Sequence, residues 1–323
     1  MGEPREAYVN RIGTALGDEI RTVEATSGKG GLLTACSTLR EAGFAQHHVC
    51  SENTTAYDLA RRAVQDLDDV VRIHAAKMGA ILYSTCLPAN ANLGDPREFD
   101  RTGDVKHLMD FPASHLQADF GFDNASVIGL TQQACTSLIG SMRLARSLLV
   151  SEAELENILC VTADRFPIGA KYEQAYNLIS DGAAACVVSA RAEGFRIVAS
   201  HAITNGALAR ATDDETVGSY FTYMHRIITE TLAKARLNMK EIDWIVPQNT
   251  NLNAWKILCH LLKFDNARVY LESIGEVGHI ISSDNLVNLQ RLDQSGRIQS
   301  GQRVLLVMAG FGLNWQSMIL EKC

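Results

Sequence analysis

The sequence predicts an α/β fold built from two related halves, 1–190 and 191–323. Short continuous apolar runs at 158–163 and 184–189 are typical of strands that are buried on both faces. Segments with helical periodicity alternate with such runs, and the order strand, helix, strand, strand occurs twice along the chain. This alternation predicts a mainly parallel sheet in each half.

The first half begins with extended and helical segments. Residues 7–12 form an extended stretch, and an amphipathic helix starts at Tyr57, with Asn53 or Thr54 as candidate N-cap. Residues 88–120 are rich in Pro, Asn, Asp and Gly, which predicts a long surface excursion after the strand at 79–85. Long ordered loops are usually functional, so we expect this one to border the site.

The stretch 128–141 passes from an extended apolar run into a helix, with Cys135 at the transition. Beyond Cys135 the apolar residues recur at spacings of three and four, at Leu138, Ile139, Met142, Ala145 and Leu149. The unpaired N–H groups at a helix N-terminus favour the thiolate, so this position suits a nucleophile. The alternative is a small buried cysteine that packs like alanine.

The second half repeats the pattern with polar residues at its strand ends. A strand at 242–247 is followed by Gln248, Asn249 and Asn251, and then by a helix from 253 to 262. A closing pair of strands, 303–309 and 315–320, is joined by Gly310, Phe311 and Gly312. Ligands of parallel sheets bind at the carboxyl ends of strands, so we expect these residues to meet Cys135.

Composition excludes several classes of protein. A net charge of −7 argues against nucleic acid as a partner, because phosphate binding needs a basic field. No apolar run approaches the roughly 20 residues of a membrane span, and the N-terminus lacks a signal core. The eight cysteines form no CxxC pair, which disfavours a metal site and predicts reduced thiols in the cytoplasm.

Two glycine-rich segments carry a resemblance to a known family. Residues 181–185 (DGAAA) resemble the GDGAGA turn, and residues 310–315 (GFGLNW) resemble the closing GGGFTWG stretch, of the thiolase superfamily. In order and spacing the chain resembles the β-ketoacyl-acyl carrier protein synthase III branch over nearly its whole length. The resemblance implies a thiolase-like fold with five αβαβα layers, a homodimer and no permanently bound cofactor. It also implies an acyl-coenzyme A or phosphopantetheine thioester as substrate.

Two catalytic motifs of this family are altered here. Gln248 stands where the histidine of a PHQAN motif is expected, and His279 stands where the asparagine of a GNTSAAS motif is expected. The resemblance implies that Cys135 takes the acyl group. It places the oxyanion and substrate-positioning groups among Gly310, Phe311, Gly312, Asn249 and Asn251.

The altered set Cys135, His279 and Gln248 predicts acyl transfer to a hydroxyl or amine. Gln248 can donate a hydrogen bond but cannot act as a base, whereas His279 can accept a proton from a small-molecule alcohol or amine. We therefore expect an acyltransferase of specialised metabolism with a coenzyme A or carrier-protein donor.

Two alternatives to this acyltransferase remain open. The first is a decarboxylating synthase, because relatives with a Cys-His-His set catalyse condensation. The second is a non-catalytic partner subunit, against which the intact Cys135 argues.

The donor-binding region is less clearly marked. Arg40 lies near His47 and His48, in the region where the family places basic contacts to coenzyme A. This segment is poorer in arginine than is usual for the family, which favours a carrier-protein donor. The alternative is a polar surface loop without a role in binding.

Overall fold

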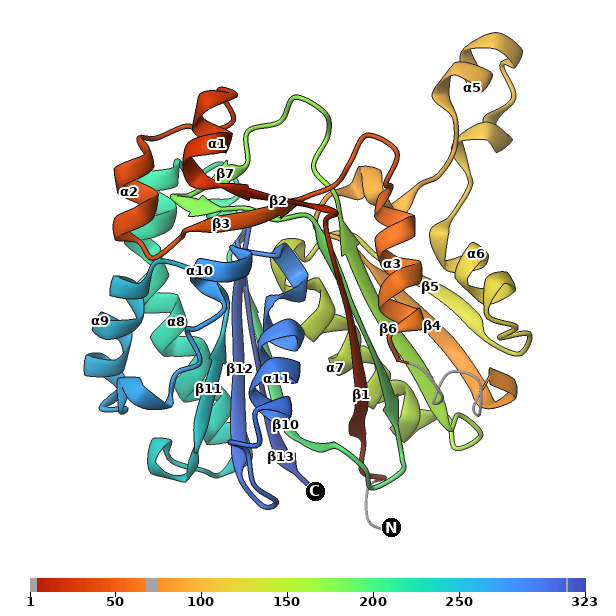
Figure 1. The fold of residues 1–323 in the computed structure, drawn as a ribbon. Helices are drawn as coiled ribbons and strands as arrows, with labels where there is room; N and C mark the ends of the chain where they lie inside the picture. Colours follow the sequence, from red (N-terminus) through yellow and green to blue (C-terminus); the bar gives the residue numbers. More distant parts are fainter. Residues whose placement is uncertain (1–4, 68–74, 312) are drawn as a thin grey trace.

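The computed structural model describes residues 5–67, 75–311 and 313–323. Nine strands within these ranges form one sheet in the order β11-β12-β13-β10-β1-β9-β6-β4-β5 (Figure 1). They are β1 (Tyr8–Leu16), β4 (Met78–Ser84), β5 (Ser126–Leu130), β6 (Asn157–Asp164), β9 (Gly182–Ser189), β10 (Phe195–Thr204), β11 (Trp244–Pro247), β12 (Arg303–Gly310) and β13 (Asn314–Lys322).

The sheet consists of two halves that meet at a short seam. β5, β4, β6, β9 and β1 come from the first part of the chain, and β10 to β13 come from the second. The seam is an antiparallel pairing of Tyr8 with Arg196 and of Val9 with Phe195. A boundary at residues 190 and 191 remains a proposal.

The prediction of mainly parallel halves is wrong. Among the nine described strands of the sheet, the parallel pairs are β4–β5, β4–β6 and β11–β12, and the other pairs are antiparallel. A parallel neighbour needs a crossover connection of a dozen or more residues. Only three residues separate β12 from β13 in the sequence, and so short a connection permits only an antiparallel pair.

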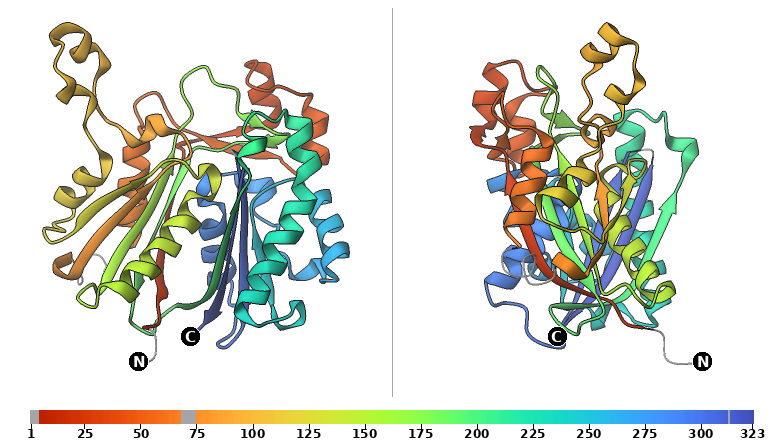
Figure 2. Two further views of the ribbon diagram at one scale, coloured as in Figure 1. Left: turned by 180° about the vertical axis from the view of Figure 1, so that it is seen from behind. Right: turned by 90° about the vertical axis from the view of Figure 1, so that its right-hand side faces the viewer.

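Helices complete the five αβαβα layers that were expected. α7 (Ser137–Ser151) and α11 (Asp284–Gln294) form the middle layer, because each packs on strands of both halves. α3 (Ala56–Gln65) and α6 (Pro112–Asp119) cover the outer face of the first half. α8 (Asp213–Ala235) and α9 (Leu252–Leu262) lie outside the second half, as the views in Figures 1 and 2 show.

Two local expectations need correction. The N-cap of α3 is Thr55, whose hydroxyl accepts the N–H of Asp58 while the Asp58 carboxylate accepts the N–H of Thr55. Thr54 donates to Asp18 instead. The segment 88–120 is more than a loop, because its second part is α6, whose Leu116 is fully buried.

The first part of that segment carries α5 (Pro96–Thr102), which projects from the body in Figures 1 and 2. Its tip lies well away from the C-terminus and from the start of β1, which are both at the opposite end of the molecule.

Small elements cover the end of the sheets where the site lies (Figure 1). They are α1 (Val23–Gly28), α2 (Cys36–Glu41), α10 (Ile274–Val277) and the short strands β2 (Glu19–Thr22), β3 (Gln46–Val49), β7 (Glu173–Gln174) and β8 (Asn177–Leu178). No helix in the described part of the chain is long and apolar enough to cross a membrane.

Candidate active site

Cys135 lies on a sharp turn that leads into α7. A single turn of 3₁₀ helix (Ala134–Thr136) connects β5 to this helix, and Ala134 has a left-handed φ of 45°. A non-glycine residue in this region is strained, and such strain concentrates at functional sites. The turn places the buried Cys135 side chain against a cavity between the two halves of the sheet.

Gly310, at the end of β12, permits this close approach of the two halves. A Cβ atom at residue 310 would lie 2.9 Å from the backbone nitrogen of Cys135 and 3.0 Å from the carbonyl oxygen of Gln133. Any side chain would therefore push the turn away, so glycine is required here for steric reasons.

His279 is held by its backbone and by a carboxylate. Its N–H donates to the carbonyl of Leu178 at 2.8 Å, and its own carbonyl accepts from the N–H of Ser180 at 2.8 Å. Its Nδ1 lies 2.5 Å from Oδ2 of Asp284. This contact favours the tautomer with the proton on Nδ1. Nε2 is then the ring nitrogen that can exchange a proton with a molecule in the cavity.

Asp284 is fully buried and is the first residue of α11. Besides contacting His279, its carboxylate accepts the N–H of Asn249 at 2.7 Å and that of Ile280 at 2.6 Å. Together with the helix N-terminus, these donors stabilise the negative charge. Asp284 is not among the site residues predicted from the sequence. The available signal was a single carboxylate five residues after the displaced histidine.

The sulfur and the imidazole shift each other's ionisation. A hydrogen bond with the Cys86 thiol, whose Sγ is 3.9 Å from Sγ of Cys135, lowers the pKa of Cys135. Burial opposes this effect and His279 adds to it, giving a pKa of about 5. Burial also lowers the pKa of His279, but the Asp284 carboxylate outweighs it and raises this pKa to about 10. At neutral pH the site therefore holds a thiolate–imidazolium pair.

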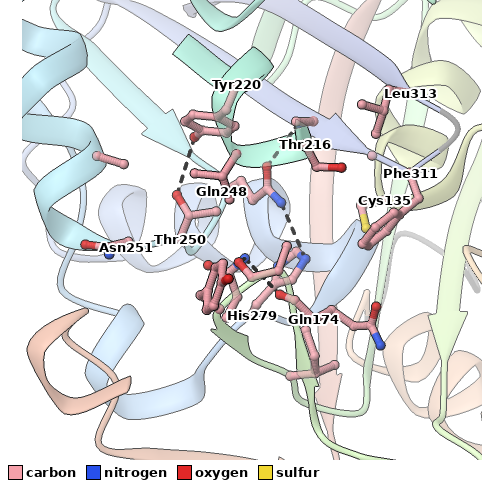
Figure 3. A pocket seen from close by; sticks show the side chains of 18 of the residues that line it. Cys135, Gln174, Thr216, Tyr220, Gln248, Thr250, Asn251, His279, Phe311 and Leu313 are labelled. Carbon is pink, nitrogen blue, oxygen red and sulfur yellow. Dashed lines mark hydrogen bonds between the residues drawn. The ribbon is translucent and has the colours of Figure 1, made fainter. Parts of the chain in front are cut away.

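Gln248 follows β11 and is oriented by the neighbouring strand. Its Oε1 accepts the N–H of Ala309 at 3.0 Å, which turns the amide nitrogen toward His279. Nε2 of Gln248 lies 3.5 Å from Nε2 of His279, and Figure 3 shows this amide directed at the ring. Gln248 is thus a fixed hydrogen-bond donor at the cavity wall.

The other predicted residues divide between the cavity and its support. Gly310, Phe311 and Asn251 line the cavity with Cys135, whereas Gly312 lies outside the described residues. Asn249 is fully buried behind the wall.

The buried Asn249 side chain supports the loop that carries the histidine. Its Nδ2 donates to the carbonyl of Gly278, the residue before His279, at 2.8 Å. Its Oδ1 accepts from Asn288 on α11 at 2.8 Å. Asn249 therefore connects the His279 loop to the helix that carries Asp284.

The predicted donor-binding segment lies beside the cavity rather than in it. Arg40 is an exposed residue of α2 whose guanidinium pairs with Glu24 at 2.7 Å, and it does not line the cavity. A role of Arg40 in donor binding therefore stays a prediction. For His47 the alternative of a polar surface loop is wrong, because this residue is fully buried in β3 between Thr26 and the carbonyl of Ile179.

The cavity has a volume of about 350 Å³, in the range of small-molecule sites (Figure 3). No Asp, Glu, Lys or Arg occurs among the described residues of its wall. Its aromatic members are Phe166, Tyr176, Tyr220, Phe221, Phe311 and Trp315. Hydroxyl and amide groups come from Thr38, Gln174, Asn177, Thr216, Thr250, Asn251 and Asn253. In residues 5–67, 75–311 and 313–323, no group of three or more His, Cys, Asp or Glu is arranged to hold a metal ion.

Comparison with known families gives two matches. The model described as 3-oxoacyl-[acyl-carrier-protein] synthase III matches residues 131–206, which include Cys135. The model described as the C-terminal part of that synthase matches residues 232–322, which include His279 and Asp284. The two matches together cover just over half of the chain.

Whole-length relatives agree with these matches. The chain is 28% identical to a β-ketoacyl-[acyl-carrier-protein] synthase III of Campylobacter curvus, covering 88% of this chain and 87% of the relative. A synthase III structure from Thermus thermophilus aligns with a TM-score of 0.81 at 22% identity, over 98% of this chain and 99% of that one. A structure named ChlB3 acyltransferase aligns with a TM-score of 0.78 at 17% identity, over 98% of both chains. These structural likenesses concern the fold.

Proposed function

The chain belongs to the β-ketoacyl-acyl carrier protein synthase III-like branch of the thiolase superfamily, and on this basis we propose that it is an acyltransferase. It takes an acyl group from a coenzyme A or carrier-protein thioester onto Cys135 and passes it to a hydroxyl or amine. Enzymes of this family use such thioesters as substrates and need no permanent cofactor.

The observation that carries this proposal is the contact of Asp284 with His279, beside Cys135. A carboxylate that binds Nδ1 holds the imidazole with Nε2 toward the reacting atoms, as in Ser-His-Asp enzymes. Such a histidine can take a proton from an alcohol or amine as the acceptor attacks an acyl-cysteine. Condensation requires no deprotonation of an acceptor O–H or N–H.

The first half-reaction begins from the thiolate–imidazolium pair. The Cys135 thiolate attacks the thioester carbonyl, and backbone N–H groups of the Cys135 turn and the Gly310–Phe311 segment are the candidate donors to the oxyanion. When the tetrahedral adduct collapses, the donor thiol leaves with the proton of His279. Acyl-Cys135 and a neutral His279 remain.

The second half-reaction returns the proton. Acylation removes the charge on Cys135, which had helped to raise the pKa of His279, so the imidazole becomes a base. Nε2 takes the proton of the acceptor while its oxygen or nitrogen attacks the acyl carbonyl. Collapse of this adduct expels the Cys135 thiolate and restores the starting pair.

The wall of the cavity favours an uncharged, largely apolar acceptor. The described part of this wall contains no Lys or Arg that could bind a malonyl carboxylate. The His279 imidazolium is the cationic group that it offers. A neutral alcohol or amine on an aromatic or aliphatic framework would find aromatic faces such as those of Tyr220 and Phe221, with amides at Asn251 and Asn253. This fits an acceptor from specialised metabolism.

A decarboxylating synthase is the second candidate, because the relatives of this chain are named synthase III. Gln248 could then hold the enolate oxygen by a hydrogen bond. The third candidate, a non-catalytic partner subunit, is disfavoured because Cys135 is intact beside the Asp284–His279 pair, which together form a complete nucleophile and base.

A homodimer and a cytoplasmic location belong to the same proposal. β5 is an edge strand with an exposed Val127 and pairs only with β4 among the described strands. A second copy could continue the sheet there. All eight cysteines are free thiols, as expected in a reducing compartment.

Acyl loading followed by mass spectrometry tests the proposal. The protein is mixed with an acyl-coenzyme A and digested, and we expect the adduct on the peptide that contains Cys135. Cys135→Ala should abolish it, whereas Cys323→Ala, at an exposed terminal thiol, should not. An adduct that persists in the Cys135 variant would reject the proposal.

A further inference from the structure

A second cysteine lies against the nucleophile. Sγ of Cys86 is 3.9 Å from Sγ of Cys135, a hydrogen-bonding distance for sulfur, although 49 residues separate them. Cys86 follows β4 and is not among the residues that line the cavity.

A buried carboxylate fixes the Cys86 segment. Asp164, at the end of β6, accepts the N–H of Cys86 at 3.0 Å and the N–H of Leu87 at 3.0 Å. It also accepts the hydroxyl of Thr85 at 2.5 Å. Because three consecutive residues bind one carboxylate, the backbone at Cys86 has little freedom, and its side chain is directed at Cys135.

We propose that the Cys86 thiol donates a hydrogen bond to the Cys135 sulfur whenever that sulfur is negatively charged, and that Asp164 positions it. The sulfur is anionic before the attack on the thioester and again when the acyl group leaves. Cys86 therefore acts in both half-reactions without forming a covalent bond. The inference rests on the proposed role of Cys135 as the acyl carrier.

The alternative role for Cys86 is that of a second acyl carrier. The hydrogen bond to Cys135, together with burial, raises the pKa of the Cys86 thiol far above its usual range. Cys86 thus stays protonated when Cys135 is a thiolate, which suits a donor and not a nucleophile.

The test is the pH dependence of alkylation of Cys135 by iodoacetamide, followed on its own peptide by mass spectrometry. The titratable groups near this sulfur are Cys86, His279 and, through the histidine, Asp284, while Asp164 faces Cys86. Burial raises the pKa of Asp164 to about 6, so its charge also changes over the pH range of this assay. The quantity compared is the midpoint, the pH at which the alkylation rate of Cys135 is half of its maximum. Cys86→Ala removes the donor and should raise this midpoint by about one pH unit. Cys86→Ser keeps a donor and should stay near the unmodified protein, as should the surface control Cys323→Ala.

Two further variants complete the test. Cys86→Val fills the space but has no donor, so its midpoint should equal that of Cys86→Ala. This variant separates the loss of the hydrogen bond from the effect of an unfilled space. Asp164→Asn keeps one acceptor oxygen, so it should also raise the midpoint, but by less than Cys86→Ala does. Equal midpoints in the Ala, Val, Ser and unmodified proteins would overturn the proposal.

Failure of this inference can be told apart from failure of the proposed function. If Cys135 still takes up an acyl group while the Cys86 variants leave its midpoint unchanged, only the role of Cys86 is rejected. If Cys86→Ala instead removes a second acyl adduct from the Cys86 peptide, Cys86 is a carrier and the donor role is wrong.

Discussion

Oδ2 of Asp284 lies 2.5 Å from Nδ1 of His279, and the same oxygen accepts the backbone N–H of Asn249. The carboxylate therefore joins the loop after β11 to the start of α11 and fixes the ring between them. The proposed base-catalysed acyl transfer rests on the position of this pair beside Cys135.

The first prediction concerns Asp284. Asp284→Asn should keep the shape of the site but weaken the hold on Nδ1, so that transfer of the acyl group to an alcohol falls by about 10²–10⁴-fold. Single-turnover measurement of ester formation checks this value. The control is Asp293→Asn, an acid on the same helix that pairs with Lys322, and it should leave the rate unchanged. A rate for Asp284→Asn equal to that of the control would contradict the role of the carboxylate.

The second prediction separates His279 from Gln248. His279→Ala should still acylate at Cys135 in alkaline buffer but should accumulate the acyl-enzyme, because the base for the acceptor is lost. Gln248→Ala removes one oriented hydrogen bond and should slow transfer by only about fivefold to tenfold. Intact-protein mass spectra taken over time report both species. Equal persistence of the acyl-enzyme in the two variants would argue against a base at His279.

The third prediction is the pH profile of acyl loading. The pKa of Cys135 is lowered to about 5, so the thiolate and the loading rate are lost as the pH falls through that value. The pKa of His279 is raised to about 10, so the proton needed by the leaving thiol is lost as the pH rises through that value. We expect a plateau between these limits, measured with a pH-stable thioester. A single rise near the ordinary thiol pKa of about 8.5 would contradict the ion pair.

The fourth prediction concerns Gly310. Gly310→Ala places a methyl group 2.9 Å from the Cys135 nitrogen, so the turn must move and loading should fall at least 100-fold. The matched control is Gly206→Ala, because a Cβ at residue 206 would meet no atom within 4 Å. Thermal melting of both variants distinguishes a displaced turn from an unfolded protein. Normal loading by Gly310→Ala would show that the turn tolerates the shift.

Much of the fold could be predicted from local patterns. The runs around 79–85, 158–163 and 184–189 could be recognised as strands because both of their faces are buried, which makes most of their positions apolar. The direction of the strands could not be predicted in the same way. The short connection from β12 to β13 does imply an antiparallel pair. The antiparallel pairing of β1 with β9, however, joins segments from the two ends of the first half, and no local periodicity reveals it.

Only some residues of the candidate site could be predicted from the sequence. Cys135 and His279 stand on motif positions and could be named from the sequence. Asp284 meets His279 only because α11 begins at that residue, and Cys86 meets Cys135 only because β4 and β5 are adjacent. Both contacts are products of tertiary packing, so spacing along the chain does not reveal them.

The most direct test of the central claim is the fate of one purified acyl-Cys135 enzyme offered two partners. The acyl-enzyme is mixed with a neutral aromatic alcohol in one reaction and with a malonyl thioester in another, and the products are followed by mass spectrometry. We predict release of the ester at a rate that depends on Asp284, with no carbon dioxide or β-ketoacyl product from the malonyl thioester. Formation of a β-ketoacyl product while the alcohol leaves the acyl-enzyme intact would contradict the account and assign the chain to condensation.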